Sequence, residues 1–238
     1  MPELSVVIPC YNEAKNIPLL LQRFAAFKNV DFELVLVNNG SSDNTASVLD
    51  RDLKKYKFVR SVFIKKNIGY GHGIMTGLWS CKSPVLGYTH ADLQCDPKDV
   101  FRAFDMYKKS GGKVFVKGVR VHRKLTPAML ARCLDVVASI VMKMRFYDIN
   151  AQPKLFPNSF LQYFQHAPNG YYLDLFVVAK IKRTGIKIKE IPVTFEKRLY
   201  GISSWKTSFM SRVRNIIRFF FACFEVRKLI RLRTRANN

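Results

Sequence analysis

The stretch that decides the fold of this chain is THADLQCDP, residues 89–97. The apolar run PVLGY, residues 84–88, precedes it and predicts a buried strand, while a helical pattern starts near Pro97. Ligands of α/β sheets usually bind at the carboxyl ends of the strands. The polar stretch is therefore predicted to form part of a binding site at a strand end.

Three polar side chains alternate within this stretch. An extended backbone would place His90, Asp92 and Gln94 on one face. An imidazole nitrogen, a carboxylate and an amide oxygen suit a divalent cation, so the sequence predicts a metal site here. The alternative interpretation is that Asp92 or Asp96 caps the following helix.

The composition predicts a folded, basic protein. Hydrophobic residues make up 48% of the 238 residues, which is enough for a core. The net charge of +23 predicts an anionic partner: nucleic acid, an acidic membrane or a phosphate-bearing substrate. Five cysteines without a CxxC pair indicate neither a zinc site nor a disulfide framework, which fits a reducing cytosol. No signal peptide and no membrane-spanning helix are expected.

The first half of the chain alternates predicted strands and helices, which argues for a parallel sheet with right-handed crossovers. The predicted strands cover residues 4–9, 33–37, 58–64 and 84–88. The polar loops 9–13 and 38–43 follow two of these strands, so they are expected to meet the stretch 90–96 in one nucleotide-binding crevice. GxGxxG and GxxxxGK[ST] motifs are absent, which argues against dinucleotide and P-loop sites.

The second half is less regular. A fifth strand is predicted over 113–117, with a basic cluster at 120–124 beyond its end. The helix predicted over 127–143 is apolar on most sides, so it is either buried or faces a membrane. The segment 148–156 is predicted to be a loop followed by a short strand, and a helix over 171–183 and a strand over 186–195 come after it.

The last stretch, residues 206–238, predicts a long basic helix. It holds nine Lys and Arg and one acidic residue. This pattern is typical of a helix lying on an anionic membrane, and the alternative is a helix docked on the domain with a solvated charged face. The predicted apolar stripe consists of Phe209, Val213, Ile216, Ile217, Phe220 and Phe224.

Several motifs occur in a fixed order between residues 4 and 206. They are VVIPCYNE at 6–13, NGSSDNT at 39–45, NIGYG at 67–71, ADLQ at 91–94, DINAQPK at 148–154, and EIPV at 190–193 followed by Arg198, Gly201 and Ser203. Together they resemble the family 2 glycosyltransferases, in particular the branch of dolichol-phosphate mannose synthases and bacterial polyprenyl-phosphate sugar transferases.

The resemblance implies an α/β fold of the GT-A type, which is a Rossmann-like, mostly parallel sheet flanked by helices. It implies a catalytic domain over 1–206, with a nucleotide-binding half at 1–117 and an acceptor half at 118–206. The basic amphipathic helix of 207–238 would follow as a membrane-associating segment. The implied donor is a nucleotide-diphosphate sugar, transferred with inversion at the anomeric carbon.

The resemblance also implies roles for individual residues. Nucleotide binding is expected of Pro9, Tyr11, Glu13, Asn38, Asn39, Asp43, Gly69, Ala91 and Asp92. Binding of the diphosphate or of an acceptor phosphate is expected of Arg120, Gln152, Lys154, Arg198, Ser203 and Lys206. The metal, Mn²⁺ or Mg²⁺, is expected at His90, Asp92 and Gln94.

Two positions depart from the family pattern. The family usually carries Asp where this chain has Asn38 or Asn39, and an amide can donate as well as accept, so the identity of the base stays open. The family's first metal-binding Asp is His90 here, which shifts the preference from magnesium toward manganese. If His90 is not a ligand, Asp92 and Gln94 hold the ion with help from the diphosphate alone.

The chemistry of the acceptor decides whether a base is needed. Loss of the diphosphate requires positive charge, which we expect from the metal at Asp92 and from Arg120 and Arg198. An alcohol acceptor also needs a carboxylate base, whereas a phosphate is already ionised near neutral pH. The basic excess favours a phosphate acceptor. Asp174 is the candidate base for an alcohol, and the alternative is that it is a helix-terminus or salt-bridge residue.

The sequence thus predicts a metal-dependent inverting glycosyltransferase on the cytoplasmic face of a membrane, acting on a polyprenyl phosphate or another lipid-linked acceptor. Either the last helix suffices for attachment or a separate membrane protein takes part. The replacements at His90, Asn38 and Asn39 leave open a catalytically silent nucleotide-binding relative. A nucleic-acid-binding module, motivated by the charge alone, is not expected because no stacking platform or reading motif is present.

Overall fold

The computed structural model describes residues 1–123, 125–200 and 209–232, with no side-chain description for 125–127 and 209–212. The strands are β1 (Leu4–Cys10), β2 (Phe32–Asn39), β3 (Val59–Ile64), β4 (Val85–Tyr88), β5 (Phe115–Val121), β6 (Lys154–Pro157) and β7 (Ile188–Thr194). The α-helices are α1 (Ile17–Phe24), α2 (Thr45–Asp52), α3 (Tyr70–Trp79), α4 (Pro97–Lys109), α5 (Leu125–Met142), α6 (Leu173–Thr184) and α7 (Phe209–Leu229). Short 3₁₀ helices cover Leu53–Lys55 and Asn158–Phe164.

The seven strands form one sheet in the order β3-β2-β1-β4-β6-β5-β7. β6 is antiparallel to both of its neighbours, while the other pairs are parallel. This confirms the predicted mostly parallel α/β sheet. Residue 117, where the two predicted halves of the domain meet, lies within β5, and the division into halves remains a prediction.

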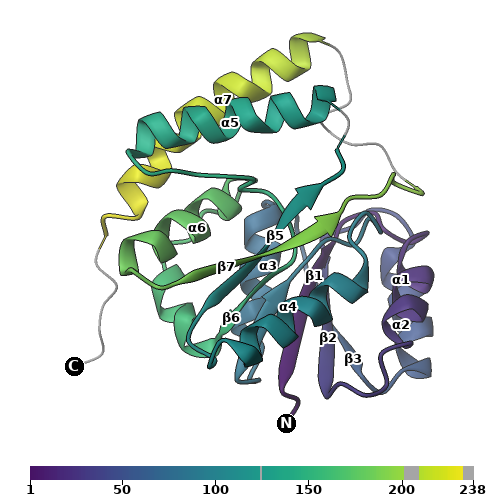
Figure 1. The fold of residues 1–238 in the computed structure, drawn as a ribbon. Helices are drawn as coiled ribbons and strands as arrows, with labels where there is room; N and C mark the ends of the chain where they lie inside the picture. The colour runs from purple at the N-terminus through teal and green to yellow at the C-terminus, as the bar shows by residue number, and fades with distance from the viewer. Residues whose placement is uncertain (124, 201–208, 233–238) are drawn as a thin grey trace.

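Helices cover both faces of the sheet, and each face has its own hydrophobic core (Figure 1). β1 contributes to both cores because its side chains alternate: Val7 enters the core with α3 and α6, and Val6 enters the core with α1 and α4. A strand buried on both faces reads as a continuous apolar run, which is the pattern seen at 4–9. The buried residues of α1 are Ile17, Leu20, Leu21 and Phe24, which form one apolar stripe facing the sheet.

α5 and α7 lie side by side as an outer layer beyond α6, on one side of the molecule (Figure 1). α7 docks through Ala222, Cys223 and Val226, which are buried. The predicted apolar stripe is therefore not the docked face: its members Ile217, Phe220 and Phe224 stay exposed. Within the described part of the chain, no helix is both long enough and apolar enough to cross a membrane.

α3 packs unusually close to the sheet, and this brings its glycine-rich start to the strand ends. A Cβ atom added to Gly77 would lie 2.4 Å from Cγ1 of Val7 and 2.7 Å from Cγ2 of Val37. The helix can approach the sheet this closely because Gly77 has no side chain.

We therefore expect Gly77→Ala to lower the free energy of unfolding measured in urea. In an open helix the same change stabilises by about 1 kcal/mol, but overpacking a core costs about 1–3 kcal/mol. Thr76→Ala in the same helix is the control, because it adds no atom at this contact. A Gly77→Ala protein more stable than the wild type would contradict the close packing of α3.

Candidate active site

The loops that follow β1 and β2 are held together at one rim of the sheet. Asn12, in a left-handed conformation with φ of 58°, accepts from the backbone N–H of Ser42 at 2.9 Å, and its own N–H donates to Ser41 Oγ at 3.1 Å. Asp43 accepts from the backbone N–H of Thr45 at 2.9 Å. Tyr11 is exposed beside these contacts. The two loops thus meet at one rim of the sheet, as predicted.

The two asparagines at the end of β2 are buried and organise this rim. Asn38 Oδ1 accepts from the backbone N–H of Ser41 at 3.1 Å. Asn39 Nδ2 donates to the carbonyl of Gly69 at 3.0 Å, which links β2 to the start of α3. Asn39 Oδ1 has no hydrogen-bond partner among the described residues. Contact of either amide with a base remains a prediction.

Gly69 is required by the backbone that passes over it. Its φ is 138°, and a Cβ atom there would lie 2.1 Å from the carbonyl oxygen of Asn169. The N–H of His72 donates to the same carbonyl at 3.1 Å. The glycine-rich turn therefore packs against the backbone of the segment before α6. This packing explains why residue 69 is glycine, without any role in nucleotide binding.

The stretch 90–94 is not extended as the sequence pattern predicted. The chain bends after β4 at residues 91–93, and Leu93 has a left-handed φ of 60°. This bend is closed by Asp92 Oδ1, which accepts from the N–H of Gln94 at 3.2 Å. Asp96 caps α4 by accepting from the N–H of Lys98 at 2.8 Å, so the capping interpretation is confirmed for Asp96.

Arg198 lies between Asp92 and Gln94. Its guanidinium contacts Asp92 Oδ2 at 2.7 Å and donates from Nε to Gln94 Oε1 at 3.1 Å. The segment after β7 is paired with this bend, since the N–H of Glu196 donates to the Gln94 carbonyl at 3.0 Å. One cationic group is thus held by the two oxygens that were predicted to bind the metal.

These two oxygens also define how a metal would fit. Among the described residues, no three His, Cys, Asp or Glu side chains come together as a metal site. Asp92 and Gln94 nevertheless converge on a single cation, the Arg198 guanidinium. Such a pair suits a divalent ion that takes its other ligands from water and from substrate phosphates.

His90 belongs to an aromatic cluster. Its ring stacks on Tyr70 at 5.7 Å between centroids and meets the edge of Phe195 at 6.5 Å. Burial lowers the pKa of His90, and the nearby Asp92 carboxylate opposes that change. The neutral form is favoured by burial and could ligate a metal, but no hydrogen bond joins His90 to Asp92 or Gln94 within the described part of the chain, so its role as a ligand remains a prediction.

Glu13 adds negative charge at the same rim. Burial raises the pKa of this carboxyl, and Asp92 and Asp43 raise it further, while a hydrogen bond from Asn16 acts in the opposite direction. A positive group arriving between Glu13 and Asp92 would relieve this repulsion. The rim is therefore suited to a cation together with its anionic partner.

A second cluster forms at the end of β5. Arg120 lies inside this strand rather than beyond it, and its side chain and backbone N–H both bind the Asp148 carboxylate. Arg123 contacts the same carboxylate at 3.6 Å. Burial would raise the pKa of Asp148, but the hydrogen bonds and charge of Arg120 outweigh it and lower the pKa. Asp135 of α5 fixes the loop by accepting from the N–H of Asp148 at 2.7 Å.

A cavity of about 540 Å³ opens beside this cluster, and we call it the Arg120 cavity. Arg120, Arg123 and Asp148 line it from the sheet side, and Met129 and Arg132 line it from α5. None of the residues predicted to bind the nucleotide lines it. The site thus has two parts, the Asp92 rim and the Arg120 cavity.

Asp174 is buried and ion-paired beneath the site. Lys154 Nζ contacts its Oδ1 at 2.7 Å, and the Tyr88 hydroxyl donates to the same oxygen at 2.9 Å. Gln152 Nε2 donates to both carboxylate oxygens, at 3.2 and 3.3 Å. This geometry favours the salt-bridge interpretation of Asp174 over the catalytic base. It also removes Lys154, which is fully buried, from direct contact with a phosphate.

The structure groups the predicted residues unevenly. The Asp92 rim brings together residues from the ends of β1, β2, β4 and β7: Pro9, Tyr11, Glu13, Asn38, Asn39, Asp43, Ala91, Asp92, Gln94 and Arg198. Arg120 lies in the second cluster. Ser203 and Lys206 lie outside the described residues.

Sequence reasoning missed Asp148 as the carboxylate that holds Arg120, although it stood inside the motif at 148–154. Its backbone φ of 46° is a signal that only the structure provides. Tyr88 was also missed, because a tyrosine in an apolar strand reads as core until its hydroxyl partner is known.

Comparison with known proteins places this arrangement among glycosyl transferases. Residues 5–129 match the profile of the family described as "Glycosyl transferase family 2". This match covers the Asp92 rim except for the segment after β7.

Two curated relatives are bacterial lipid-linked sugar transferases by name. The chain is 39% identical over 104 residues to the undecaprenyl-phosphate 4-deoxy-4-formamido-L-arabinose transferase of Pseudomonas savastanoi, covering 42% of this chain and 31% of the relative. It is 31% identical over 126 residues to the enzyme of the same name from Yersinia enterocolitica, covering 51% and 38%. The matched stretch therefore spans well under half the length of these relatives.

Solved structures show the same fold at low sequence identity. Glucosyl-3-phosphoglycerate synthase from Mycobacterium tuberculosis, in complex with phosphoglyceric acid, superposes with a TM-score of 0.73 at 16% identity, covering 95% of this chain and 80% of that one. The same enzyme in complex with Mn²⁺, UDP and glucosyl-3-phosphoglycerate gives a TM-score of 0.70, also at 16% identity, with the same coverage.

Asp174→Asn is expected to lower the free energy of unfolding by about 3–5 kcal/mol, because it leaves the Lys154 charge buried without a counter-charge. The double variant Asp174→Leu with Lys154→Met removes both charges and should recover most of this loss. Urea unfolding of the three proteins tests the difference. A stable Asp174→Asn protein that has lost only turnover would instead support the role of catalytic base.

Proposed function

The chain belongs to glycosyl transferase family 2, and from this premise we propose that it transfers a sugar from a nucleotide-diphosphate donor to a lipid-linked phosphate acceptor. The observation that carries the proposal is the pair of oxygens of Asp92 and Gln94 closed around the Arg198 guanidinium. The named activity of the relatives supports the class of acceptor. The matched region is only part of those relatives, so the activity is proposed for this chain rather than transferred to it.

The donor fits the Asp92 rim. Its base and ribose would lie on the loops after β1 and β2, beside Tyr11 and Asp43. Its diphosphate would then reach Asp92, where Asp92 and Gln94 would hold the divalent cation. When bound, that cation neutralises the charge that develops on the diphosphate as it leaves.

Arg198 has two states in this proposal. Without donor, its guanidinium satisfies Asp92 and Gln94, which avoids leaving a buried carboxylate unpaired. When a donor occupies the rim, the same guanidinium is released to bind phosphate oxygens, for which its planar set of donors is suited. The guanidinium that neutralises Asp92 in the absence of donor would thus stabilise the diphosphate leaving group when the donor is bound.

The acceptor fits the Arg120 cavity. Three guanidiniums line it, those of Arg120, Arg123 and Arg132, against the two carboxylates of Asp135 and Asp148, so the lining keeps a net positive charge. An acceptor phosphate could bind to this charge and, because it is already ionised, attack without a base. The burial of Asp174 agrees with such an acceptor, since no carboxylate base is then needed.

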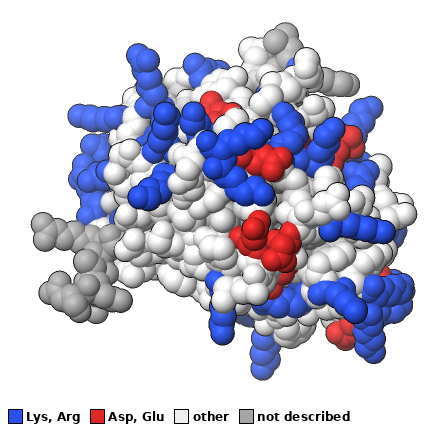
Figure 2. Space-filling model, turned by 60° about the horizontal axis from the view of Figure 1, so that its bottom comes forward, with Lys and Arg blue, Asp and Glu red and all other residues white. Residues whose placement is uncertain are grey.

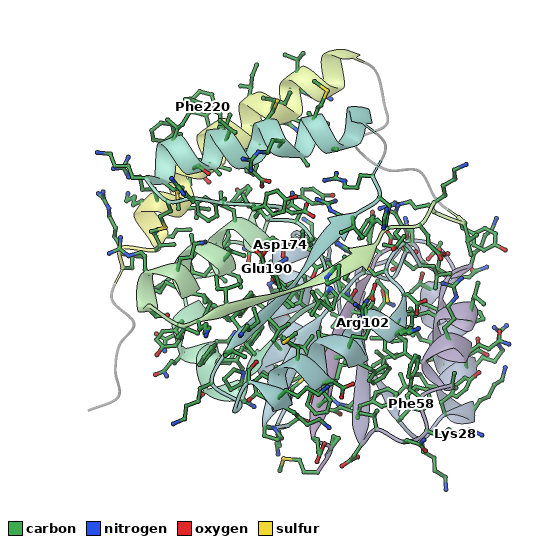
Figure 3. All side chains as sticks on the ribbon, in the orientation of Figure 1. Lys28, Phe58, Arg102, Asp174, Glu190 and Phe220 are labelled. Carbon is green, nitrogen blue, oxygen red and sulfur yellow. The ribbon has the colours of Figure 1, made fainter. Side chains whose placement is uncertain are left out.

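The outer layer of α5 and α7 would place this site at a membrane. Its exposed apolar side chains include Ile140 of α5, which is 72% exposed, and Phe221 of α7, which is 61% exposed. Phe220 lies on the outer side of α7, away from the sheet (Figure 3). Arg214 and Arg218 are exposed on the same helix. An apolar face bordered by cations suits the interface of an anionic membrane.

Charge alone does not select this layer. On the face shown in Figure 2, Lys and Arg side chains are spread widely around small groups of Asp and Glu. The exposed aromatic and aliphatic side chains, rather than the net charge of +23, therefore support attachment through α5 and α7. Attachment through a separate membrane protein would use the same surface.

The donor site is tested by calorimetric binding of UDP and GDP with Mn²⁺, with Mg²⁺ and with chelator. We expect one nucleotide to bind in a metal-dependent way. Asp92→Asn should weaken Mn²⁺ binding by about tenfold or more, because it removes the charged ligand. Arg198→Gln should strengthen Mn²⁺ binding while lowering turnover, because it removes the competing cation and a phosphate ligand together.

Arg102→Gln is the matched control, since Arg102 also pairs with a carboxylate, Asp99, at 2.8 Å but lies on α4. Its Mn²⁺ affinity should equal that of the wild type. Nucleotide binding that ignores the metal, without turnover, would favour a catalytically silent relative. No nucleotide binding under any condition would refute the donor site.

The membrane layer is tested with anionic liposomes in a flotation assay. Phe221→Ser with Phe224→Ser should weaken binding by about tenfold, since each ring contributes about 1 kcal/mol or more when it leaves water. Phe63→Ser with Trp79→Ser is the control, because these side chains are also exposed but lie on β3 and α3. Equal losses in the two double variants would contradict attachment through the outer layer.

A further inference from the structure

A second and larger cavity, of about 840 Å³, lies under α5 on the side of α6 and β7. We call it the Lys117 cavity. It shares Arg132 and Tyr147 with the Arg120 cavity, but Arg120 and Arg123 do not line it. It is therefore a separate space next to the proposed acceptor site, and the proposed transfer reaction does not use it.

Its lining is strongly cationic. It includes one carboxylate, that of Glu190. It also includes five positive side chains: Lys117, Arg132, Lys143, Arg145 and Lys182. Glu190 pairs with Lys117 at 3.2 Å, so these two charges cancel. The other four cations form no ion pair within the described residues. Four uncompensated charges around one cavity favour an anionic occupant.

The floor of the cavity is fixed and cannot supply the missing negative charge. Lys117 is buried, and its Nζ donates to the Tyr147 carbonyl at 3.0 Å and to the Gly118 carbonyl at 3.2 Å. Arg132 lies over the Tyr147 ring at 5.5 Å, which orients its guanidinium without neutralising it. Burial lowers the pKa of Lys117, whereas Glu190 opposes that change.

The wall formed by α5 is apolar and continues onto the outer surface. Val136 and Ile140 line the cavity, and both are also exposed, at 43% and 72%. These side chains belong to the outer layer that we place on the membrane. An occupant would therefore meet cations inside the cavity and hydrocarbon-compatible side chains at its mouth.

We propose that the Lys117 cavity binds the phosphate-bearing headgroup of an anionic membrane phospholipid that is not the sugar acceptor. The four unpaired cations match its phosphate, and Val136 and Ile140 lie where its acyl chains would leave the cavity. A free phosphate or phosphorylated metabolite would use the cations but leave the apolar wall without a partner. This inference rests on the proposed attachment of the outer layer to a membrane.

The test uses the full chain and dihexanoyl phosphatidylglycerol below its micelle concentration, with binding measured by calorimetry. Dihexanoyl phosphatidylcholine and glycerol phosphate are the comparison ligands. The cavity variant carries Lys143→Gln, Arg145→Gln and Lys182→Gln. The control variant carries Lys28→Gln, Lys57→Gln and Lys65→Gln, which lowers the net charge equally at exposed positions. Lys28 lies at the opposite end of the molecule from Phe220 (Figure 3).

We expect phosphatidylglycerol to bind more tightly than both comparison ligands, and the cavity variant to bind it at least tenfold more weakly than the control variant. Each cation near an anionic lipid surface contributes about fivefold in affinity, so three make such a loss measurable. Equal binding by the two variants would overturn the proposal. Glycerol phosphate that binds as tightly as the lipid would also overturn the proposal, because the ligand of the cavity would then be a free anion.

The outcome can be separated from the fate of the proposed function. Calorimetric binding of UDP with Mn²⁺ is measured on the same cavity variant, whose substituted residues lie outside the Asp92 rim. Loss of lipid binding with retained nucleotide binding supports the cavity as a separate site. Failure of nucleotide binding in the wild type refutes the donor site without bearing on the Lys117 cavity.

Discussion

The buried ion pair of Lys154 and Asp174 is the interaction on which the rest of the molecule depends. Lys154 belongs to β6, which runs antiparallel to both of its neighbours, and Asp174 lies in the first turn of α6. Burying two charges is costly unless each is paired and hydrogen-bonded, and here Tyr88 and Gln152 complete the set. The pair therefore joins β6 to the start of α6, and the Tyr88 hydroxyl adds β4 to the same contact. β6 in turn pairs with β4 and β5, so it links the parallel strands of the first half of the chain to β5 and β7.

Above this pair, the site is built from cations and carboxylates that are already paired with each other. Arg198 closes on Asp92, and Arg120 closes on Asp148. A buried carboxylate without a counter-charge would be unfavourable, and the chain supplies its own cations at the places where we propose that a metal ion and phosphates bind. In that proposal, an anionic donor would replace one set of ion pairs by another, which costs less than creating charge in a dry site.

The outer layer of α5 and α7 depends on which side chains α7 buries. α7 buries a narrow face of small and β-branched residues, Ala222, Cys223 and Val226, against the domain and leaves Phe220, Phe221 and Phe224 exposed. The C-terminal end of this helix is held by Lys180, which donates to the Leu232 carbonyl at 2.9 Å. Docking through small residues lets α7 lie close beside α5, so the two helices present one apolar surface. The two cavities under α5 open next to that surface, where we propose that the acceptor and a phospholipid bind.

The sequence by itself determined the order of strands and helices, because apolar periodicity and the loops that follow the strands depend only on local pattern. It determined the Asp92 rim as well, since parallel strands bring their carboxyl ends to one edge. It also identified Arg198 by its motif and Arg120 by the basic cluster at 120–124. It did not determine the bend at Leu93, the stacking of His90 on Tyr70, or the face by which α7 docks. It also could not separate a catalytic Asp174 from a buried one. Each of these is decided by partners distant in the chain: β6 places Lys154 beside Asp174, α5 places Asp135 beneath Asp148, and burial sets which charges must be paired. Only the tertiary structure brings those partners together.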